Sequence, residues 1–282
     1  MAVSQQQASS RDRRTGFVLG VALWLFTLAT LWLFGANLHK MPPPASDFAP
    51  QIDAILWVIL GISVIGFVGL HLYLGWVALS RPAEVRAIYL PADRPKEWLW
   101  VLVPIGLLLV ADLTFDHMSN KVWGAFFGKP PANAFEVEVT GQQFAWHVRY
   151  PGADGRFGRT NPRLISDENP IGLDLSDPAA RDDILLINVM HVPEGRPVMI
   201  YLRSRDVLHS FFLPPMRIKM DCVPGYTTRM WFTPQRKGNY EIACAELCGM
   251  GHYNMKGLLV VEDEQAVQNW LAQQTPFSKR GQ

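Results

Sequence analysis

The sequence predicts N-terminal transmembrane helices followed by an all-β domain. Residues 17–115 contain three long apolar runs with few charges, as membrane-spanning helices do. From residue 134 onward the apolar runs become short and are separated by turn residues, which is typical of the strands of a β-sandwich or barrel. The 49% hydrophobic content and ten tryptophans of this 282-residue chain agree with membrane segments.

The long apolar runs predict spans at about residues 17–35, 52–79 and 98–115. The first run carries no charge over 19 positions, close to the ~20 residues of helix that cross the hydrocarbon core. The second is long enough to span with tilt, and the third tolerates Pro104 as a kink. A cleavable signal peptide is the alternative for the first run. Because that run exceeds the ~7–15 residues of a signal sequence, we expect it to be retained.

Basic residues predict the orientation of these spans. Residues 1–16 hold three arginines and the connection 81–96 holds four basic residues, whereas 36–51 holds one lysine. Loops rich in lysine and arginine stay in the cytoplasm, so the chain from residue 116 is expected outside. The predicted parts are a cytoplasmic tail (1–16), a membrane anchor (17–115), an extracytoplasmic domain (116–263), and a C-terminal helix and tail (264–282).

Short apolar runs predict the strands of the extracytoplasmic domain. They read FEVEVTG, ILLINV, PVMIYLRS, TTRMWFTP, NYEIACA and GLLVVED. The segment 151–183 is rich in Gly, Pro, Asp and Arg and predicts a long surface loop. Helical patterning returns only at residues 264–274. The formal net charge of +1 gives no basic excess for nucleic acid, so we expect no such partner.

A cluster of metal-ligand side chains lies near the end of the domain. Cys244, Cys248, His252 and Met255 fall within twelve residues. Thiolate, imidazole and thioether ligands select copper over magnesium or calcium, and the methionine argues against a structural zinc site. Two thiolates can bridge two copper ions, and such a core changes little when an electron is added. A second imidazole is then needed, and His209 is the candidate.

Other interpretations of these residues leave some of them unused. A mononuclear blue-copper site needs one cysteine and leaves the other thiol unexplained. A disulfide between Cys244 and Cys248 leaves His252 and Met255 idle. The third cysteine, Cys222, is interpreted as a buried small side chain. The remaining histidines are interpreted as structural or solvent-facing: His39, His71, His117, His147 and His191.

The string CAELCGMGHYNM closely resembles the CuA-binding motif of cytochrome c oxidase subunit II. The resemblance extends through DVLHSFFLP and KMDCVPG to the third apolar run, and covers about residues 52–262. It implies a cupredoxin-like Greek-key domain with a binuclear copper centre. The implied ligands are His209, Cys244, the backbone carbonyl of Glu246, Cys248, His252 and Met255.

The resemblance also implies sites outside the copper cluster. The carboxylate of Glu246 would face a magnesium ion shared with subunit I. Glu97 matches a glutamate at the cytoplasmic mouth of a proton-uptake channel. Where electrons enter, the family commonly has Gln-Trp-x-Trp, whereas this chain has Gln-Phe-Ala-Trp ending at Trp146. Either Trp146 takes over that role or Phe144 serves mainly as a docking surface. The first span is an addition to the two that family members usually have.

The function implied by the resemblance is electron transfer in a haem-copper terminal oxidase. The copper centre would accept electrons from cytochrome c or a similar donor and pass them to haem in subunit I. Subunit I would reduce oxygen to water and couple the reaction to proton pumping. The expected partners are subunit I, other oxidase subunits, the donor and the lipid membrane. The expected location is the inner membrane of a bacterial-type cell, with the copper domain on the periplasmic side, rather than the mitochondrial inner membrane.

Two other functions fit parts of the sequence. The copper-containing subunit of a nitric oxide reductase would look alike, because electron acceptance is the shared task. A membrane-anchored copper carrier or assembly factor would bind copper transiently through Met and Cys, and would release it to a chelator. A quinol oxidase subunit would lack the thiols.

Overall fold

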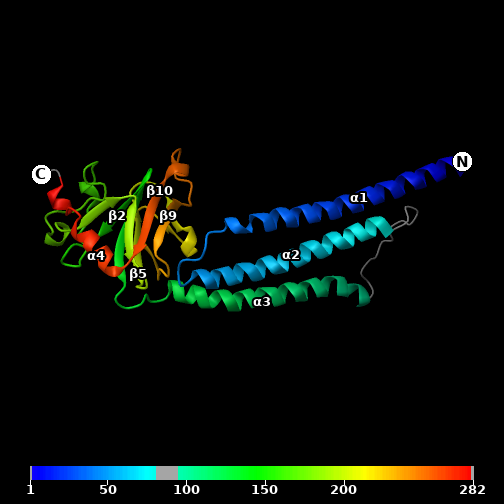
Figure 1. The fold of residues 1–282 in the computed structure, drawn as a ribbon, viewed down its shortest axis with the longest axis horizontal. Coiled ribbons are helices and arrows are strands. Elements are labelled where there is room, and N and C mark those ends of the chain that lie inside the picture. The colour runs from blue at the N-terminus through cyan, green and yellow to red at the C-terminus, as the bar shows by residue number, and fades with distance from the viewer. Residues whose placement is uncertain (1, 81–94, 281–282) are drawn as a thin grey trace. The chain divides into compact units, whose positions relative to one another are not determined.

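Long helices form the N-terminal part of the chain and strands form most of the rest (Figure 1). The computed structural model describes residues 2–80 and 95–280, with side chains from Arg13 onward. It divides into two compact units, Met1–Pro42 with Ala54–Ser119, and Pro43–Asp53 with Asn120–Gln282.

Three helices dominate the first unit: α1 (Ala2–Asn37), α2 (Ala49–Ser80) and α3 (Leu99–Phe127). Each contains a segment long and apolar enough to cross a membrane. In the most apolar 18-residue windows of α2 and α3, no residue is buried against the described protein. Apolar surface of this extent requires lipid or a partner protein. Pro104 lies inside α3, as expected for a membrane helix.

The helices extend beyond the predicted apolar runs. α3 continues to Phe127, because polar residues such as Asp112 and Asp116 end the hydrophobic pattern without breaking a helix. It ends before Gly128 and a pair of prolines. α1 likewise begins within the polar segment before residue 17. Most of the predicted cytoplasmic connection 81–96 lies outside the described residues.

Two five-stranded sheets build the β domain of the second unit. The first has the order β3 (Ile184–Ile187), β2 (Ala145–Tyr150), β1 (Phe135–Gln142), β5 (Val198–Ser204), β8 (Thr228–Phe232). The second has the order β4 (Val189–Pro193), β10 (Lys256–Glu262), β9 (Gly238–Cys244), β6 (His209–Leu213), β7 (Ile218–Cys222). Fully buried Val137 and Ile200 of the first sheet share a core with Phe211 and Leu259 of the second. The predicted order of apolar helices followed by an all-β sandwich is confirmed.

The strand predictions differ from the structure at informative points. The run ILLINV forms two strands in different sheets, because Asn188 adopts a left-handed φ of 59° between β3 and β4. Strand β2 was not predicted, although apolar Trp146 and Tyr150 alternate with polar His147 and Arg149 as in a strand. Both polar side chains are buried, so neither face of β2 meets solvent. The short strands β6 and β7 were also absent from the predicted set.

The segment 151–183 covers the outer face of the first sheet and is more ordered than a simple surface loop. Arg149 donates to Asp183 Oδ2 at 3.0 Å and to Glu138 Oε2 at 2.9 Å, and Gly158 N–H donates to the same Asp183 oxygen. A small second core supports this segment, formed by Ile171, Leu173, Ala180, Leu185 and Phe277. Buried charges are tolerated when they are paired in this way.

A C-terminal helix, α4 (Glu264–Ala272), packs on the domain near β4. Trp270 of this helix stacks on His191 with 3.7 Å between the ring centroids. His191 Nδ1 lies 2.6 Å from Glu262 Oε1. These contacts give His191 the structural role predicted for it.

We predict that Ile200→Ala destabilises the β domain by about 2–5 kcal/mol, because it leaves a cavity in the shared core. Ile187→Ala is the matched control, since Ile187 is 56% exposed and its truncation should cost less than about 0.5 kcal/mol. Chemical unfolding of the full chain in detergent, followed by near-ultraviolet circular dichroism, measures both. Equal losses for the two variants would contradict the assigned core.

Candidate metal centre

Three neighbouring strands bring the predicted ligands together at one end of the second sheet. Strand β6 begins at His209, β9 ends at Cys244, and β10 begins directly after Met255. Because β9 lies between β10 and β6, these three sequence positions meet in space. The Cys244 N–H donates to the Met255 carbonyl at 3.3 Å, and Cys244 pairs in register with Phe211 of β6. His209 is thus the first residue of β6.

The donor atoms of these side chains converge. Cys244 Sγ lies 3.9 Å from Cys248 Sγ and 4.0 Å from His209 Nδ1. Cys248 Sγ lies 3.6 Å from His252 Nδ1 and 3.7 Å from Met255 Sδ. The donor atoms of His209, Cys244 and Cys248 all fall within 4.8 Å of one another. The structure thus brings together side chains separated by up to 46 positions in the sequence.

The distance between the two sulfurs excludes a disulfide and fits a shared metal. A disulfide needs about 2.05 Å, and both cysteines are free. Taking zinc as a guide, metal bonds to thiolate and imidazole are about 2.3 and 2.1 Å. One ion can therefore contact both sulfurs, because 3.9 Å is less than about 4.6 Å, twice the metal–thiolate bond. The thiol, imidazole and thioether donors match the ligand preference of copper.

The loop between β9 and β10 is held in place by the turn between β1 and β2. Gln143 Nε2 donates to the Cys248 carbonyl at 2.5 Å. Gly249 adopts a φ of 132°, and a Cβ there would lie 2.8 Å from Gln143 Nε2. The Glu246 carbonyl oxygen lies 3.2 Å from Cys244 Sγ, while its side chain is exposed. Glycine at position 249 therefore allows the loop to approach the turn closely.

Asp206 orients the imidazole of His209 and was not predicted. Its Oδ1 accepts from His209 Nε2 at 2.8 Å, so the Nδ1 lone pair faces Cys244. Asp206 also accepts from the Gln143 and Val207 N–H groups. Burial raises the pKa of Asp206, but these hydrogen bonds outweigh it and the pKa lies below its usual value. A carboxylate three residues before a proposed histidine ligand was the available sequence signal.

Side chains from the first sheet cover the His209 ring, which is fully buried. Trp146 lies edge-on to the ring, with 6.0 Å between centroids. A Cβ on Gly141 would lie 2.8 Å from His209 Cδ2. Trp146 is itself fully buried, whereas Phe144 is 39% exposed and packs beside Gly251 of the ligand loop. Of the two aromatic residues predicted where electrons enter, only Phe144 reaches the surface.

Burial disfavours a free thiolate at the centre, and a bound cation would offset this penalty. Burial raises the pKa of the Cys248 thiol to about 11, and the neighbouring Cys244 thiol adds to the increase. Two adjacent thiolates without a cation would repel each other. A bound metal ion reverses this effect and deprotonates coordinating thiols.

Two further residues singled out in the sequence lie away from the cluster. Cys222 is fully buried, as predicted, and it does not belong to the clustered donors found among the described residues. Burial raises its thiol pKa, which makes it unreactive. Glu97 lies in a short 3-10 helix, Pro95–Trp98, directly before α3.

Helices apolar enough to span a membrane and a β-sandwich whose sulfur and imidazole donors could hold a metal ion are the features of a membrane-anchored metalloprotein. Residues 135–263 match the family model described as the periplasmic domain of cytochrome c oxidase subunit II. The alternative cytochrome c oxidase subunit 2 of Bradyrhizobium diazoefficiens is 44% identical over 194 residues, 68% of each chain. Cytochrome c oxidase subunit 2 of Cereibacter sphaeroides is 29% identical over 250 residues, 82% of this chain and 78% of that one. The chain belongs to the cytochrome c oxidase subunit II family.

Membership of this family confirms the coarse predictions. The β domain is cupredoxin-like and lies on the outer side of a membrane, the family implies CuA copper, and the chain is part of an oxidoreductase complex. The solved periplasmic domain of subunit II from Bradyrhizobium japonicum aligns with a TM-score of 0.38 and 25% identity, over 51% of this chain and 95% of that one.

We predict that Asp206→Asn weakens metal binding about 10–100-fold, because the carboxylate no longer fixes the ring orientation and basicity of His209. Asp167→Asn is the control, since Asp167 is 99% exposed on its side chain. Copper competition against a chelator measures the affinity of both variants in the full chain. An unchanged affinity in Asp206→Asn would show that Asp206 does not set the position of the imidazole.

Proposed function

We propose that this chain is the electron-accepting subunit of a haem-copper terminal oxidase. In this proposal His209, Cys244, the Glu246 carbonyl, Cys248, His252 and Met255 hold a binuclear CuA centre. Cytochrome c, or a similar donor, supplies electrons that continue to haem in subunit I, where oxygen is reduced to water with proton pumping. The observation that carries the proposal is the pair of unbonded sulfurs 3.9 Å apart, with an imidazole nitrogen beside each.

The protein residues contribute rigidity to this function. A binuclear copper centre, when bound, supplies one-electron redox chemistry without loss or gain of ligands. His209, Cys248 and Met255 are buried, and the ligand loop is fixed by hydrogen bonds from both sheets, including Ala245 N–H to the Ser210 carbonyl at 2.9 Å. Side chains held in this way cannot move far when the charge of the site changes. They also exclude water, which lowers the solvent reorganisation that accompanies electron transfer.

An exposed apolar surface beside the ligands supports a docking role. Phe144, Leu208, Leu247, Met250 and Tyr253 are all exposed, Met250 to 94%. Leu208, Leu247 and Tyr253 each adjoin a proposed ligand in the sequence, and Phe144 packs beside Gly251 of the ligand loop. Exposed apolar patches rimmed by polar residues mark protein interaction sites. The chain from residue 116 onward carries equal numbers of acidic and basic residues. Contact with the donor would therefore rely on this apolar patch rather than on attraction between net charges.

The proposal assigns three further roles. Phe144 meets the electron donor, and buried Trp146 lies edge-on to His209. The exposed Glu246 carboxylate contributes to a magnesium site at the subunit I interface. Glu97, at the cytoplasmic end of α3, lies at the mouth of a proton-uptake channel. The chain is placed in the inner membrane of a bacterial-type cell as a multi-pass protein, with the copper domain in the periplasm.

We predict that Cys248→Ser abolishes the electron paramagnetic signal of one spin shared over two coppers, because a serine hydroxyl does not replace a bridging thiolate. Cys222→Ala is the matched control and should retain the signal, since Cys222 lies outside the ligand cluster. A shared-spin signal that survives in Cys248→Ser would refute the binuclear centre. Colourless copper that a chelator removes, at one ion per chain, would favour the carrier function.

We predict that Phe144→Ala lowers the second-order rate of cytochrome c oxidation about tenfold, the cost of truncating an aromatic anchor at an interface. The copper spectrum should not change, since Phe144 is not a ligand. Leu175→Ala is the control, because Leu175 is 41% exposed but lies in the covering segment 151–183. Stopped-flow mixing of the complex with reduced cytochrome c measures the rate. A rate that falls equally in both variants would contradict a specific role for Phe144.

A further inference from the structure

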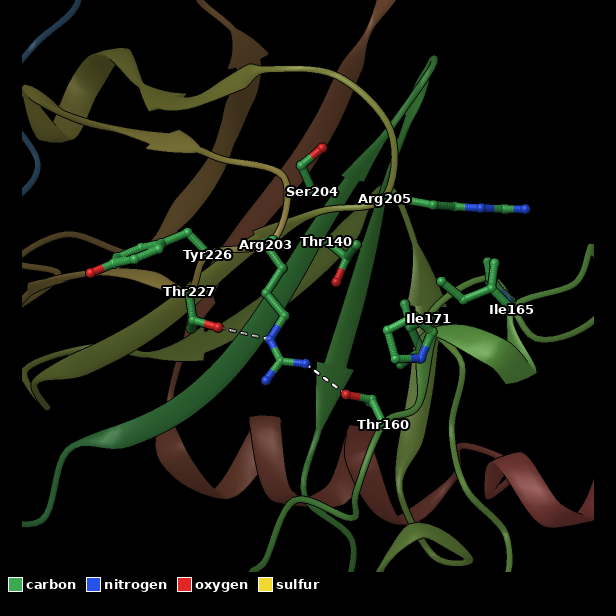
Figure 2. Close-up of a pocket in the computed structure, with 12 residues that line it drawn as sticks. Thr140, Thr160, Ile165, Ile171, Arg203, Ser204, Arg205, Tyr226 and Thr227 are labelled. Atoms are coloured by element: carbon green, nitrogen blue, oxygen red, sulfur yellow. Dashed lines mark hydrogen bonds between the residues drawn. The ribbon is translucent and has the colours of Figure 1, made fainter.

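A cavity of about 300 Å³ lies on the outer face of the first sheet. It is bounded by the ends of β1 and β5, the covering segment near residues 160–171, and the turn at 225–227 (Figure 2). None of the proposed metal ligands is among the residues that line it. Its size lies at the lower end of the range for small-molecule sites, about 300–1,000 Å³.

One wall of this cavity presents a fixed guanidinium. Arg203 Nη1 donates to Thr160 Oγ1 at 2.8 Å, and Arg203 Nε donates to Thr227 Oγ1 at 3.2 Å, as the dashed lines in Figure 2 mark. Within the part of the chain that the structure describes, Nη2 of Arg203 has no hydrogen-bond partner. The hydroxyl of Thr140 lies on the same wall (Figure 2). A preorganised guanidinium with donors to spare is suited to carboxylate or phosphate.

The charges around the cavity leave it positive. Arg203 Nε lies 3.4 Å from Glu138, which also pairs with Arg149 at 2.9 Å. Arg149 pairs in turn with Asp183 at 3.0 Å, so these two arginines and two carboxylates balance. Arg205 also lines the cavity. Its Nη1 donates to Gln142 Oε1 at 2.8 Å, and its side chain extends away from Arg203, on the side of Ile165 (Figure 2). Its ion pair with Asp167, at 3.9 Å and with the Asp167 side chain 99% exposed, is screened by water and neutralises little of its charge.

The opposite wall is apolar. Ile165 and Ile171 line it, together with Pro162 and Pro170 of the covering segment. Ile171 belongs to the small core that fixes this segment to the domain. A cationic wall facing an apolar wall selects a ligand that is itself charged at one end and apolar at the other.

We propose that this cavity binds a small organic anion. Its carboxylate or phosphate group contacts Arg203, and its apolar part lies against Ile165 and Ile171. The site belongs to the chain itself and is separate from the metal centre.

Ligand-observed saturation-transfer NMR on the purified complex tests this proposal, with hexanoate and hexyl phosphate as probes and hexanol as the uncharged control. We expect saturable binding of at least one anionic probe and none of hexanol. Binding of hexanoate alone identifies a carboxylate site, and binding of hexyl phosphate alone identifies a phosphate site. Arg203→Gln should weaken binding at least about tenfold, because the charge-assisted hydrogen bond to the guanidinium is lost.

Two further variants keep the test decisive. Arg229→Gln removes the same charge from an exposed position on β8 outside the cavity and should leave affinity within twofold of the unchanged chain. Ile165→Trp fills the apolar side without touching a charge, and should abolish binding even if Arg203→Gln does not assemble into the complex. Failure of both anionic probes to bind, equal binding of hexanol, or full binding in Ile165→Trp would overturn the proposal.

Discussion

The separation of the Cys244 and Cys248 sulfurs governs the rest of the site. At 3.9 Å they are too far apart to form a disulfide, yet close enough for one metal ion to contact both. The four-residue spacing alone does not impose this distance. The loop is fixed from outside, by the Gln143 side chain on the Cys248 carbonyl and by the close approach allowed at Gly249. Because Gln143 follows β1 in the first sheet, the metal loop of the second sheet depends on the packing of the whole sandwich.

The imidazole on the other side of Cys244 is fixed by a comparable arrangement. Asp206 holds one nitrogen of His209, and Gly141 and Trp146 cover its ring. Such contacts to a ligand typically change metal affinity 10–100-fold. Exposed ion pairs elsewhere on the domain, such as Lys237 with Asp263, contribute about 0–1 kcal/mol. The polar groups that matter for function are therefore those behind the ligands, not the more numerous pairs on the surface.

Local chemistry made much of this structure predictable from the sequence. Cys244, Cys248 and Met255 lie in one short string whose donor types indicate copper, and the apolar runs are long enough to indicate spanning helices.

What the sequence did not indicate depends on tertiary packing. The burial of His147 and Arg149 on the second face of β2 is not indicated by its alternating pattern, and α3 outlasts its apolar run because Asp112 and Asp116 do not break a helix. Asp206 was missed because its hydrogen bond to the His209 ring depends on how the chain enters β6 at His209. Phe144 is exposed and Trp146 is buried. This difference also depends on the packing of the two sheets, since both residues are aromatic and lie in one short string.

We propose that two metal ions share the Cys244 and Cys248 sulfurs. Copper X-ray absorption of the purified complex, combined with copper and protein analysis, tests it most directly. We expect two coppers per chain, each with two sulfur neighbours at about 2.3 Å, the usual length of a metal–thiolate bond. We also expect a second copper atom within scattering range of the first. One copper per chain with a single sulfur neighbour, or sulfurs found bonded to each other, would contradict this proposal.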